Sequence, residues 1–175
     1  MAATGVVLPL TLLLLAAERG VELVINARHA RELRRRGAVW MERDGFGMLV
    51  AVQALLFAGL ALEGALAPWT GVSWWTWPLL GVALILQGAR YWVIATLGWR
   101  WTVRVATVPG SPRVTGGPYR WVRHPNYLVV ALETLVLPAA FGAWATLALV
   151  LPFTLVALAR RIRREERALK ALPGG

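Results

Sequence analysis

The chain has 175 residues, of which 58% are hydrophobic and 16% are charged, and its formal net charge is +10. Soluble domains carry about 25% charged and about 45–50% apolar residues, and a soluble globule of this length has too little interior to hide so much apolar surface. The composition therefore excludes an ordinary soluble domain and predicts an integral membrane protein.

Residue counts exclude several kinds of chemistry. The chain has no cysteine, which excludes disulfides, thiolate metal sites and a cysteine nucleophile. With His29 and His124 as the two histidines and Asp44 as the single aspartate, we expect neither a metal site nor a Ser-His-Asp triad. The positive charge of so apolar a chain indicates an anionic lipid surface as partner rather than nucleic acid.

Apolar runs separated by arginine-rich segments follow one another along the chain. A spanning helix needs about 20 mostly apolar residues. The runs cover residues 6–25, 48–66, 74–97 and 126–159. Positive charges follow the first run instead of preceding it, so it is interpreted as a retained helix and not as a cleaved signal. The last run is too long for one span, and Pro138 and Gly142 in its middle predict a break and a reversal, hence a helical hairpin.

The basic residues indicate how these helices are oriented. Segments 26–47, 98–125 and 160–175 hold 17 of the 19 basic residues. The positive-inside rule places all three segments in the cytoplasm. We therefore predict an all-α integral membrane protein with five transmembrane helices, the N-terminus outside and the C-terminus inside. It forms a single membrane domain, 1–175, in which three helices (1–97) precede a polar loop, the hairpin and a cytoplasmic tail helix (98–175).

The polar stretch before the hairpin has the features of an anion site. Pro125 suits the first turn of a helix, because its missing N–H would be unpaired there, so His124 is expected near the N-cap. The free N–H groups of Asn126 and Tyr127, beside Arg120, Arg123 and His124, suit a carboxylate or a phosphate. The alternative is a membrane-entry loop whose arginines contact lipid phosphates.

Two adjacent acids, Glu165 and Glu166, stand in the otherwise basic tail. They are able to bind a ligand ammonium or ribose hydroxyl groups. The alternative is ordinary helix pairing of Arg161 with Glu165 and of Glu166 with Lys170, in a tail that anchors on anionic lipid.

Arg90, in the third run, and Glu133, in the hairpin, are charges at hydrocarbon depth in the predicted membrane helices. Such charges are costly and usually face a partner or a cavity. Asn126 and Glu133 share a helix face, and the depths of Arg90 and Glu133 match, so we predict that the two pair. The pair either takes part in the chemistry or only fixes helix packing.

The loop and tail clusters together fit one ligand, S-adenosylmethionine, which carries a carboxylate, an ammonium and a sulfonium. A helix N-terminus with His124 suits the carboxylate, and a glutamate suits the ammonium or the ribose. An aromatic face such as that of Tyr127 suits cationic or adenine groups.

The same residues carry a family resemblance. The sequence A-T-L-G-W-R-W-T-V-R-V at 95–105, G-P-Y-R-W-V-R-H-P-N-Y at 117–127 and the closing R-R-E-E resemble the isoprenylcysteine carboxyl methyltransferase family, over about residues 87–169. The resemblance implies that S-adenosylmethionine binds in the C-terminal region and that the acceptor enters from the bilayer between helices. The cofactor-binding residues it implies are Tyr119, Arg120, His124, Pro125, Asn126, Tyr127, Arg164, Glu165 and Glu166.

The expected function is that of an S-adenosylmethionine-dependent methyltransferase acting on a carboxyl or phenolic hydroxyl oxygen of a lipophilic acceptor, either a small molecule or a prenylated one. Arg90 and Glu133 are the candidate catalytic residues: Arg90 favours the acceptor anion, and Glu133 orients Arg90 or takes the proton. The N-terminal part resembles bacterial members, which favours a bacterial plasma membrane. The alternatives are an NADPH-dependent reductase of the sterol-reductase type and a non-enzymatic lipid-binding or transport protein.

Overall fold

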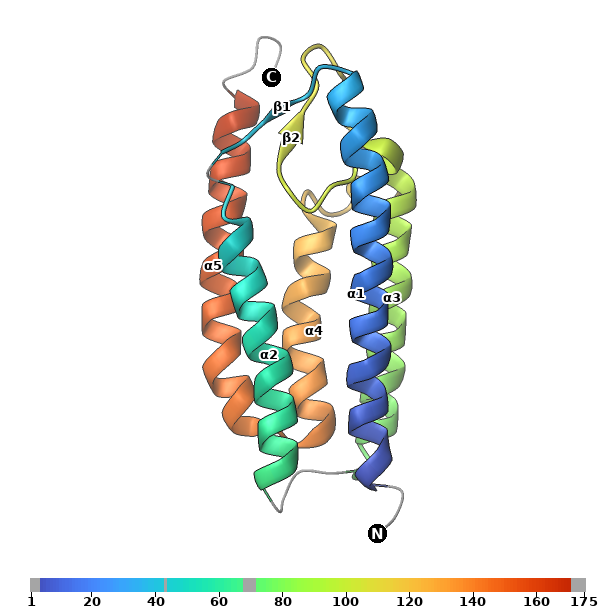
Figure 1. The fold of residues 1–175 in the computed structure, drawn as a ribbon, viewed down its shortest axis with the longest axis vertical. Coiled ribbons are helices and arrows are strands. Elements are labelled where there is room, and N and C mark those ends of the chain that lie inside the picture. Colours follow the sequence, from blue (N-terminus) through green and yellow to red (C-terminus); the bar gives the residue numbers. More distant parts are fainter. Residues whose placement is uncertain (1–3, 43, 68–71, 171–175) are drawn as a thin grey trace.

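The computed structural model describes residues 4–42, 44–67 and 72–170, and these residues are predominantly helical. The helices run side by side along the long axis of the molecule (Figure 1). Their bounds are α1 Thr4–Arg35, α2 Phe46–Leu66, α3 Thr76–Leu97, α4 Pro125–Phe141 and α5 Trp144–Lys170.

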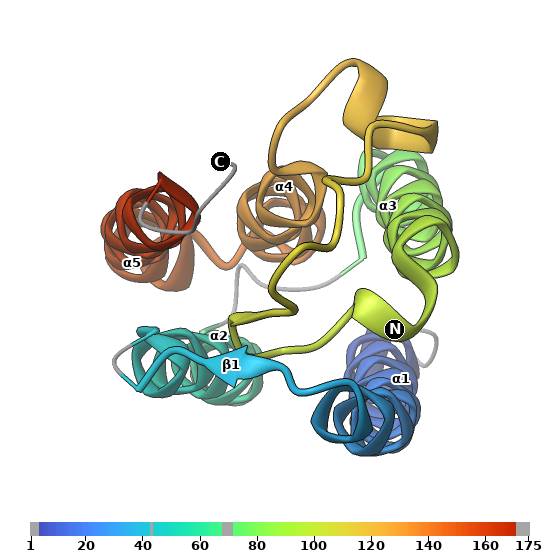
Figure 2. The same ribbon diagram turned by 90° about the horizontal axis from the view of Figure 1, so that it is seen from above.

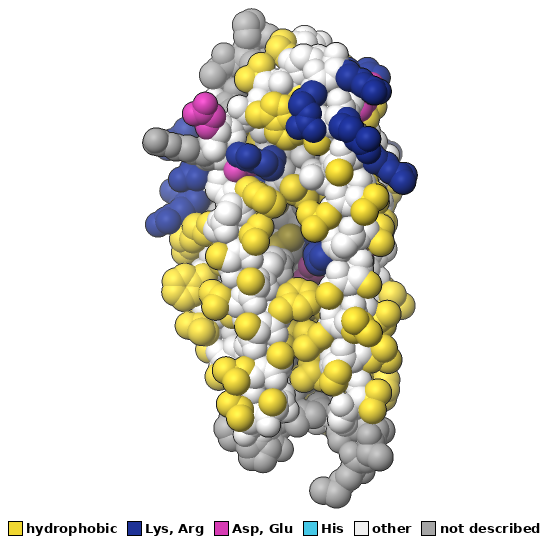
Figure 3. Space-filling view, in the orientation of Figure 1, with side chains coloured by type: hydrophobic (Ala, Val, Ile, Leu, Met, Phe, Trp, Pro, Cys, Tyr) yellow, Lys and Arg dark blue, Asp and Glu magenta, His cyan; other side chains and the backbone are white. Residues whose placement is uncertain are grey.

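Helices long and apolar enough to cross a membrane are found at Phe46–Leu66, Thr76–Arg100 and Trp144–Arg167, and Pro125–Phe141 is a shorter apolar helix. Many of their large apolar side chains point away from the protein, as Leu62 and Leu84 do, which is expected where lipid is the solvent. Hydrophobic side chains cover the face shown in Figure 3 along most of its length, and Lys and Arg gather toward one end. The fold is that of an integral membrane protein, and the count of five spans stays a prediction.

The basic end of the bundle collects the three arginine-rich segments. Helix α1 continues past its apolar run to Arg35, so it carries the first of these segments to the same end as the second and the third (Figure 1). There, Val39–Trp40 (β1) and Ala106–Thr107 (β2) form a two-stranded antiparallel sheet. Helices alone were predicted from the sequence, and this sheet, which joins two segments that are distant in the sequence, was not.

The helix break predicted at Pro138 is wrong, whereas the chain does reverse at Gly142, the glycine at which the reversal was predicted. Helix α4 continues through Pro138 to Phe141, and the chain reverses at Gly142, whose φ of 68° favours glycine. The first turn of α5 is capped by Glu63 of α2, whose carboxylate accepts hydrogen bonds from the N–H groups of Ala145 (3.2 Å) and Thr146 (2.8 Å). An anionic cap is favourable at this positive end of the helix dipole.

The core draws on all five helices and includes Leu15, Leu56, Val136 and Val150. Helices α2 and α5 approach closely at Gly59, where an added Cβ would lie 2.8 Å from the side chain of Thr146. Viewed from the basic end, the segment after α3 crosses over the helix bundle toward the start of α4 (Figure 2). This segment contains the short helices η1 Gly98–Arg100 and η2 Gly117–Arg120.

Candidate active site

A cavity of about 960 Å³ lies inside the basic half of the bundle. Small-molecule sites usually measure about 300–1,000 Å³, so the cavity is at the large end of that range. All five helices and the loop after α3 contribute to its wall. It reaches from Glu165 and Glu166 on the tail part of α5 to Arg19, Glu22 and Arg90 deeper between the helices.

At the outer end of the cavity, His124 stands between the two tail glutamates. It is the N-cap residue of α4, with Pro125 at the first helical position as predicted. Its Nδ1 lies 3.7 Å from Glu165 Oε2, and its Nε2 lies 3.6 Å from Glu166 Oε1. The ring stacks on Tyr127, with centroids 5.4 Å apart and planes 11° apart. The loop motif and the tail motif, some 40 residues apart in the sequence, therefore form one polar site.

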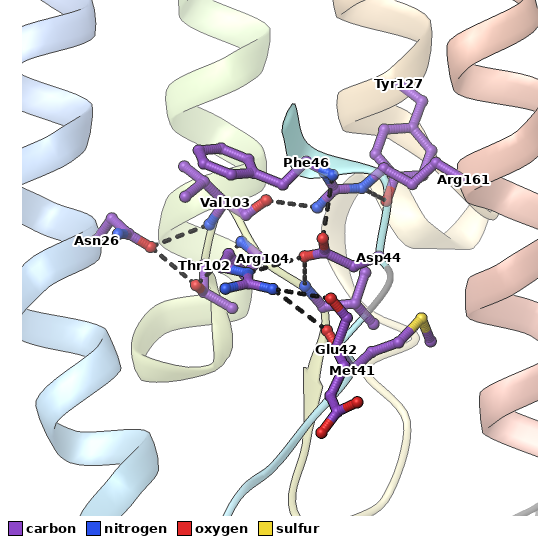
Figure 4. A network of polar contacts seen from close by, with 11 residues as sticks. Asn26, Met41, Glu42, Asp44, Phe46, Thr102, Val103, Arg104, Tyr127 and Arg161 are labelled. Carbon is purple, nitrogen blue, oxygen red and sulfur yellow. Dashed lines mark hydrogen bonds and ion pairs between the residues drawn. The ribbon is translucent and has the colours of Figure 1, made fainter. Parts of the chain in front are cut away.

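A chain of hydrogen bonds connects this site to the loop above the cavity. Tyr127 donates to Glu165 (2.7 Å), and Arg161 Nε donates to the Tyr127 oxygen (2.9 Å). Arg161 also donates to the backbone oxygen of Val103, as Figure 4 shows. The expected alternative pairing of Arg161 with Glu165 is therefore replaced by a contact through Tyr127.

Arg161 was missed as a site residue. Arg161 is only 4% exposed. Its spacing from other inward-facing residues of α5 could have predicted this burial. Thr154, Ala157, Leu158 and Arg161 fall at i, i+3, i+4 and i+7, and all four are buried. A basic residue on the inward face of a helix points to a partner inside the protein.

Polar side chains hold the loop in place over the cavity (Figure 4). Asn26 Oδ1 accepts hydrogen bonds from the Thr102 hydroxyl (2.8 Å) and the Val103 N–H (3.0 Å). The Asp44 carboxylate accepts from the N–H groups of Phe46 (3.0 Å) and Val105 (3.1 Å). Its other partner is the guanidinium of Arg104, 3.2 Å away.

These contacts change the titration of Asp44. Burial alone would raise the pKa of its carboxyl, but the hydrogen bonds from Phe46, Val105 and Arg104 outweigh burial and lower it. Tyr119, in η2, shows the opposite effect: burial and then the negative charge of Glu165 raise the pKa of its phenol. Asp44 is thus an anion, and Tyr119 a neutral hydrogen-bonding group, at neutral pH.

The structure brings most of the sequence-predicted cofactor residues to the cavity wall. Those that line it are Tyr119, His124, Asn126, Tyr127, Glu165 and Glu166. Pro125 is buried and shapes the start of α4. The Arg120 guanidinium lies 5.9 Å from the Trp121 ring, and Arg164 lies beside Gly45. The side chains of Arg120, Pro125 and Arg164 do not line this cavity.

At the inner end of the cavity, Arg90 and Glu133 form the predicted ion pair. Both are buried, with exposures of 3% and 2%, and Arg90 is the member that lines the cavity. The structure adds two residues of α1 to this pair. Arg19 lies 3.1 Å from Glu133 and 2.8 Å from Glu22, and Glu22 lies 3.3 Å from Arg90. The pair is thus part of a ring of alternating charges.

Arg19 and Glu22 were also missed as site residues. Their signal was present, since both are charges within a helix that begins as an uninterrupted apolar run. What the sequence does not show is which helix lies next to α1, and the ring connects Arg19 to a glutamate 114 positions away.

The donor set fits S-adenosylmethionine. Glu165 and Glu166 offer negative charge for an ammonium or ribose hydroxyls, and His124 at the start of α4 suits a carboxylate. Asn126 Oδ1 is buried and lacks a hydrogen-bond partner within the described residues, as expected of a group that awaits a ligand. No group of three or more His, Cys, Asp and Glu side chains in the described ranges is arranged to hold a metal ion.

Comparisons with known proteins identify the family of the chain and two relatives. The model of the isoprenylcysteine carboxyl methyltransferase family matches residues 79–171, which include every residue of the outer site. YpbQ, an uncharacterized protein of Bacillus subtilis (strain 168), is 33% identical over 92% of this chain and 95% of its own length. An uncharacterized protein of Haemophilus influenzae is 29% identical over 93% of this chain and 95% of its own length. No solved structure matches the chain.

Proposed function

Because the chain belongs to the isoprenylcysteine carboxyl methyltransferase family, a family of membrane methyltransferases, we propose that it uses S-adenosylmethionine to methylate an oxygen of a lipophilic acceptor. The acceptor oxygen is that of a carboxyl or a phenolic hydroxyl group. One observation carries the proposal: a single cavity joins the family's cofactor motif to a buried arginine between apolar helices.

The outer part of the cavity is assigned to the cofactor. Glu165 and Glu166 would hold its ammonium or ribose, and His124 with Arg123 and the first turn of α4 would hold its carboxylate. When bound, the cofactor supplies an electrophilic methyl group on a sulfonium. The chain itself positions the two reactants and excludes water, the main sources of catalysis in such a site.

The inner part of the cavity is assigned to the acceptor. Its wall there includes Leu23 of α1 and Leu49, Val50 and Phe57 of α2. Figure 3 shows a hollow between α1 and α2, with basic and acidic atoms at its floor. An alkyl chain fits between these two helices, with its polar head directed to the charges inside.

Arg90 is the residue that meets the acceptor oxygen in this arrangement. Arg90 lines the cavity, and its Nε lies 3.3 Å from Glu22 Oε1 without making a hydrogen bond to the described residues. A guanidinium stabilises an oxygen anion in a low-dielectric site. Glu133, which lies behind Arg90 and pairs with it, is a positioning residue. It fixes the orientation of Arg90 and offsets its charge.

The alternative of an NADPH-dependent reductase draws on the same cavity. Arg100, Arg104, Arg113 and Arg123 line it and would suit the phosphates of that cofactor. The two glutamates beside His124 disfavour it, because NADPH carries no ammonium group for them to bind, whereas S-adenosylmethionine does. The methyltransferase is therefore the better match to the outer site.

Calorimetry on the purified protein in lipid nanodiscs distinguishes the three functions. We expect S-adenosylmethionine to bind and NADPH not to bind. Labelled methyl groups should then appear on pentadecylphenol or hexadecanoic acid added to the nanodiscs. Binding of NADPH alone would support the reductase, and binding of neither cofactor would support a lipid-binding or transport protein.

A further inference from the structure

The charges at the inner end of the cavity do not balance. Arg19 and Arg90 each contact both Glu22 and Glu133, so these four side chains form a closed and neutral ring. A fifth charged residue, Glu18, stands one helical turn before Glu22 on α1. The cluster therefore has three carboxyl groups for two guanidinium groups.

Glu18 is the carboxyl group of the cluster that lies outside the ring. Its nearest cation is Arg19, 3.5 Å away, which already serves two other carboxylates. Both Glu18 oxygens are buried, and neither makes a hydrogen bond to the described residues. A buried carboxylate without hydrogen bonds is costly, and Glu18 and Glu22 are like charges at i and i+4. A proton on Glu18 would remove both the cost of burying this carboxylate and its repulsion with Glu22, so Glu18 is the carboxyl of the cluster that gains most from accepting one.

We propose that this cluster accepts the proton of the acceptor hydroxyl and that Glu18 keeps it. The proposal rests on the proposed methyltransferase function and deepens it, since it assigns a weakly acidic hydroxyl, such as a phenol, as the acceptor group. The proton enters at Glu22, which lines the cavity, and Glu18 lies four residues away on the same helix.

The step balances in atoms and charge. The O–H bond of the acceptor breaks, its electron pair stays on the acceptor oxygen, and an O–H bond forms on the carboxylate. The cluster changes from one net negative charge to none, and the acceptor changes from neutral to one negative charge. The new anion lies beside the ring, where Arg90 faces the cavity.

The other groups around Glu18 are less suited to hold the proton. Glu133 contacts both guanidinium groups, so a proton placed on it would weaken two ion pairs of the ring. Glu22 makes two contacts of 2.8 Å with Arg19 and lies 3.3 Å from Arg90. Tyr91 of α3 lies near Glu18 and Glu22, but its phenol already carries a proton of its own.

The proposal is tested with two acceptors that differ in acidity. At alkaline pH hexadecanoic acid is ionised, whereas pentadecylphenol keeps its proton, so only the phenol needs a base. In Glu18→Gln we expect methylation of the phenol to fall at least tenfold and methylation of the acid to stay within twofold of the wild-type rate. Equal losses for both acceptors, or no loss for the phenol, would overturn the proposal.

A second measurement is independent of turnover. Infrared difference spectra should show the carbonyl band of a newly protonated carboxyl when pentadecylphenol binds, and Glu18→Gln should abolish that band. The matched control is Glu32→Gln on the exposed end of α1, where Glu32 pairs with Arg36, and it should keep the band. A band that persists in Glu18→Gln overturns the assignment. Wild-type protein that methylates neither acceptor disproves the proposed function instead.

Discussion

His124 owes its place in the site to Pro125. The proline begins α4, so His124 becomes the N-cap residue, and its ring then meets two glutamates that arrive from α5. His124, Glu165 and Glu166 therefore lie close enough together to bind one polar ligand. The loss of any member should therefore be measured first as a loss of ligand affinity.

Replacing His124 by Ala, or Glu165 by Gln, should weaken binding of S-adenosylmethionine by roughly ten- to hundredfold. The reason is that a hydrogen bond to a charged group contributes about 1.5–3 kcal/mol. Calorimetry in detergent measures the effect. Arg163→Gln is the control, since Arg163 is exposed on α5 and its guanidinium donates to Ala159 of its own helix. Unchanged affinity in both site variants would exclude these residues from the cofactor site.

Asp44 predicts how stability depends on pH. Its pKa is lower in the folded protein than in the unfolded chain, so its stabilising contribution is complete above the unfolded value of about 3.9. That contribution is lost as the pH falls through the lower, folded pKa. Asp44→Asn should remove this part of the acid dependence and lower stability by about 1–3 kcal/mol at neutral pH. Thermal unfolding in detergent at several pH values checks both, and an identical acid dependence in the variant would contradict the assignment.

Among the elements, α1, α3 and α4 are joined by the charge ring rather than by apolar packing alone. Arg90→Leu leaves Glu22 and Glu133 to share Arg19, and breaking a buried ion pair costs about 3–5 kcal/mol. We expect this single variant to unfold at a lower temperature. The double variant Arg90→Leu with Glu133→Leu keeps the Arg19–Glu22 pair, so its unfolding temperature should recover.

Activity measurements distinguish a role of the ring in methyl transfer from a role in helix packing alone. If Arg90 meets the acceptor, the double variant folds and binds S-adenosylmethionine but methylates pentadecylphenol far more slowly than wild type. Turnover and calorimetry on the same preparation make the comparison. Turnover near the wild-type rate in the double variant would show that Arg90 and Glu133 serve packing alone.

For the whole molecule, all three basic segments lie at one end of the bundle, and the candidate cofactor site lies at that end too (Figure 1). The positive-inside rule then predicts that this end faces the cytoplasm. It also predicts that the α2–α3 connection lies outside. A cytoplasmic cofactor site needs this orientation, because S-adenosylmethionine is made in the cytosol.

The absence of cysteine makes the orientation easy to test. Single variants Ser73→Cys, just before α3, and Ser111→Cys, in the loop over the cavity, should react with an impermeant thiol reagent from opposite sides of the membrane. We expect Ser73→Cys to react in intact cells and Ser111→Cys only after permeabilisation. Labelling of both from the same side would exclude the predicted topology.

Several features of the fold and the site follow from local sequence. Apolar runs of helical length predict α2 and α3 almost to the residue, because the bilayer requires about 20 apolar residues per span. Pro125 predicts the start of α4. The pair Arg90 and Glu133 follows from matched depth, because two buried charges of opposite sign need each other.

Other features depend on contacts between distant segments. Helix α4 continues through Pro138 and does not break there, because packing against neighbouring helices offsets the backbone hydrogen bond that the proline removes. Arg161 reaches the loop at Val103, and β1 pairs with β2, since helices far apart in the sequence end side by side.

The class of protein, most of the helix positions, the segments that carry basic charge and the family motif could all be predicted from the sequence. Hydropathy, charge and helix caps act over a few residues, so a linear pattern is enough to predict them. The packing of the chain was needed to see that α1 contributes Arg19 and Glu22 to the ring, that Glu18 stays outside it, and that one cavity joins this ring to His124. These depend on which helix faces meet, and that is set by the packing of all five helices together rather than by any one of them.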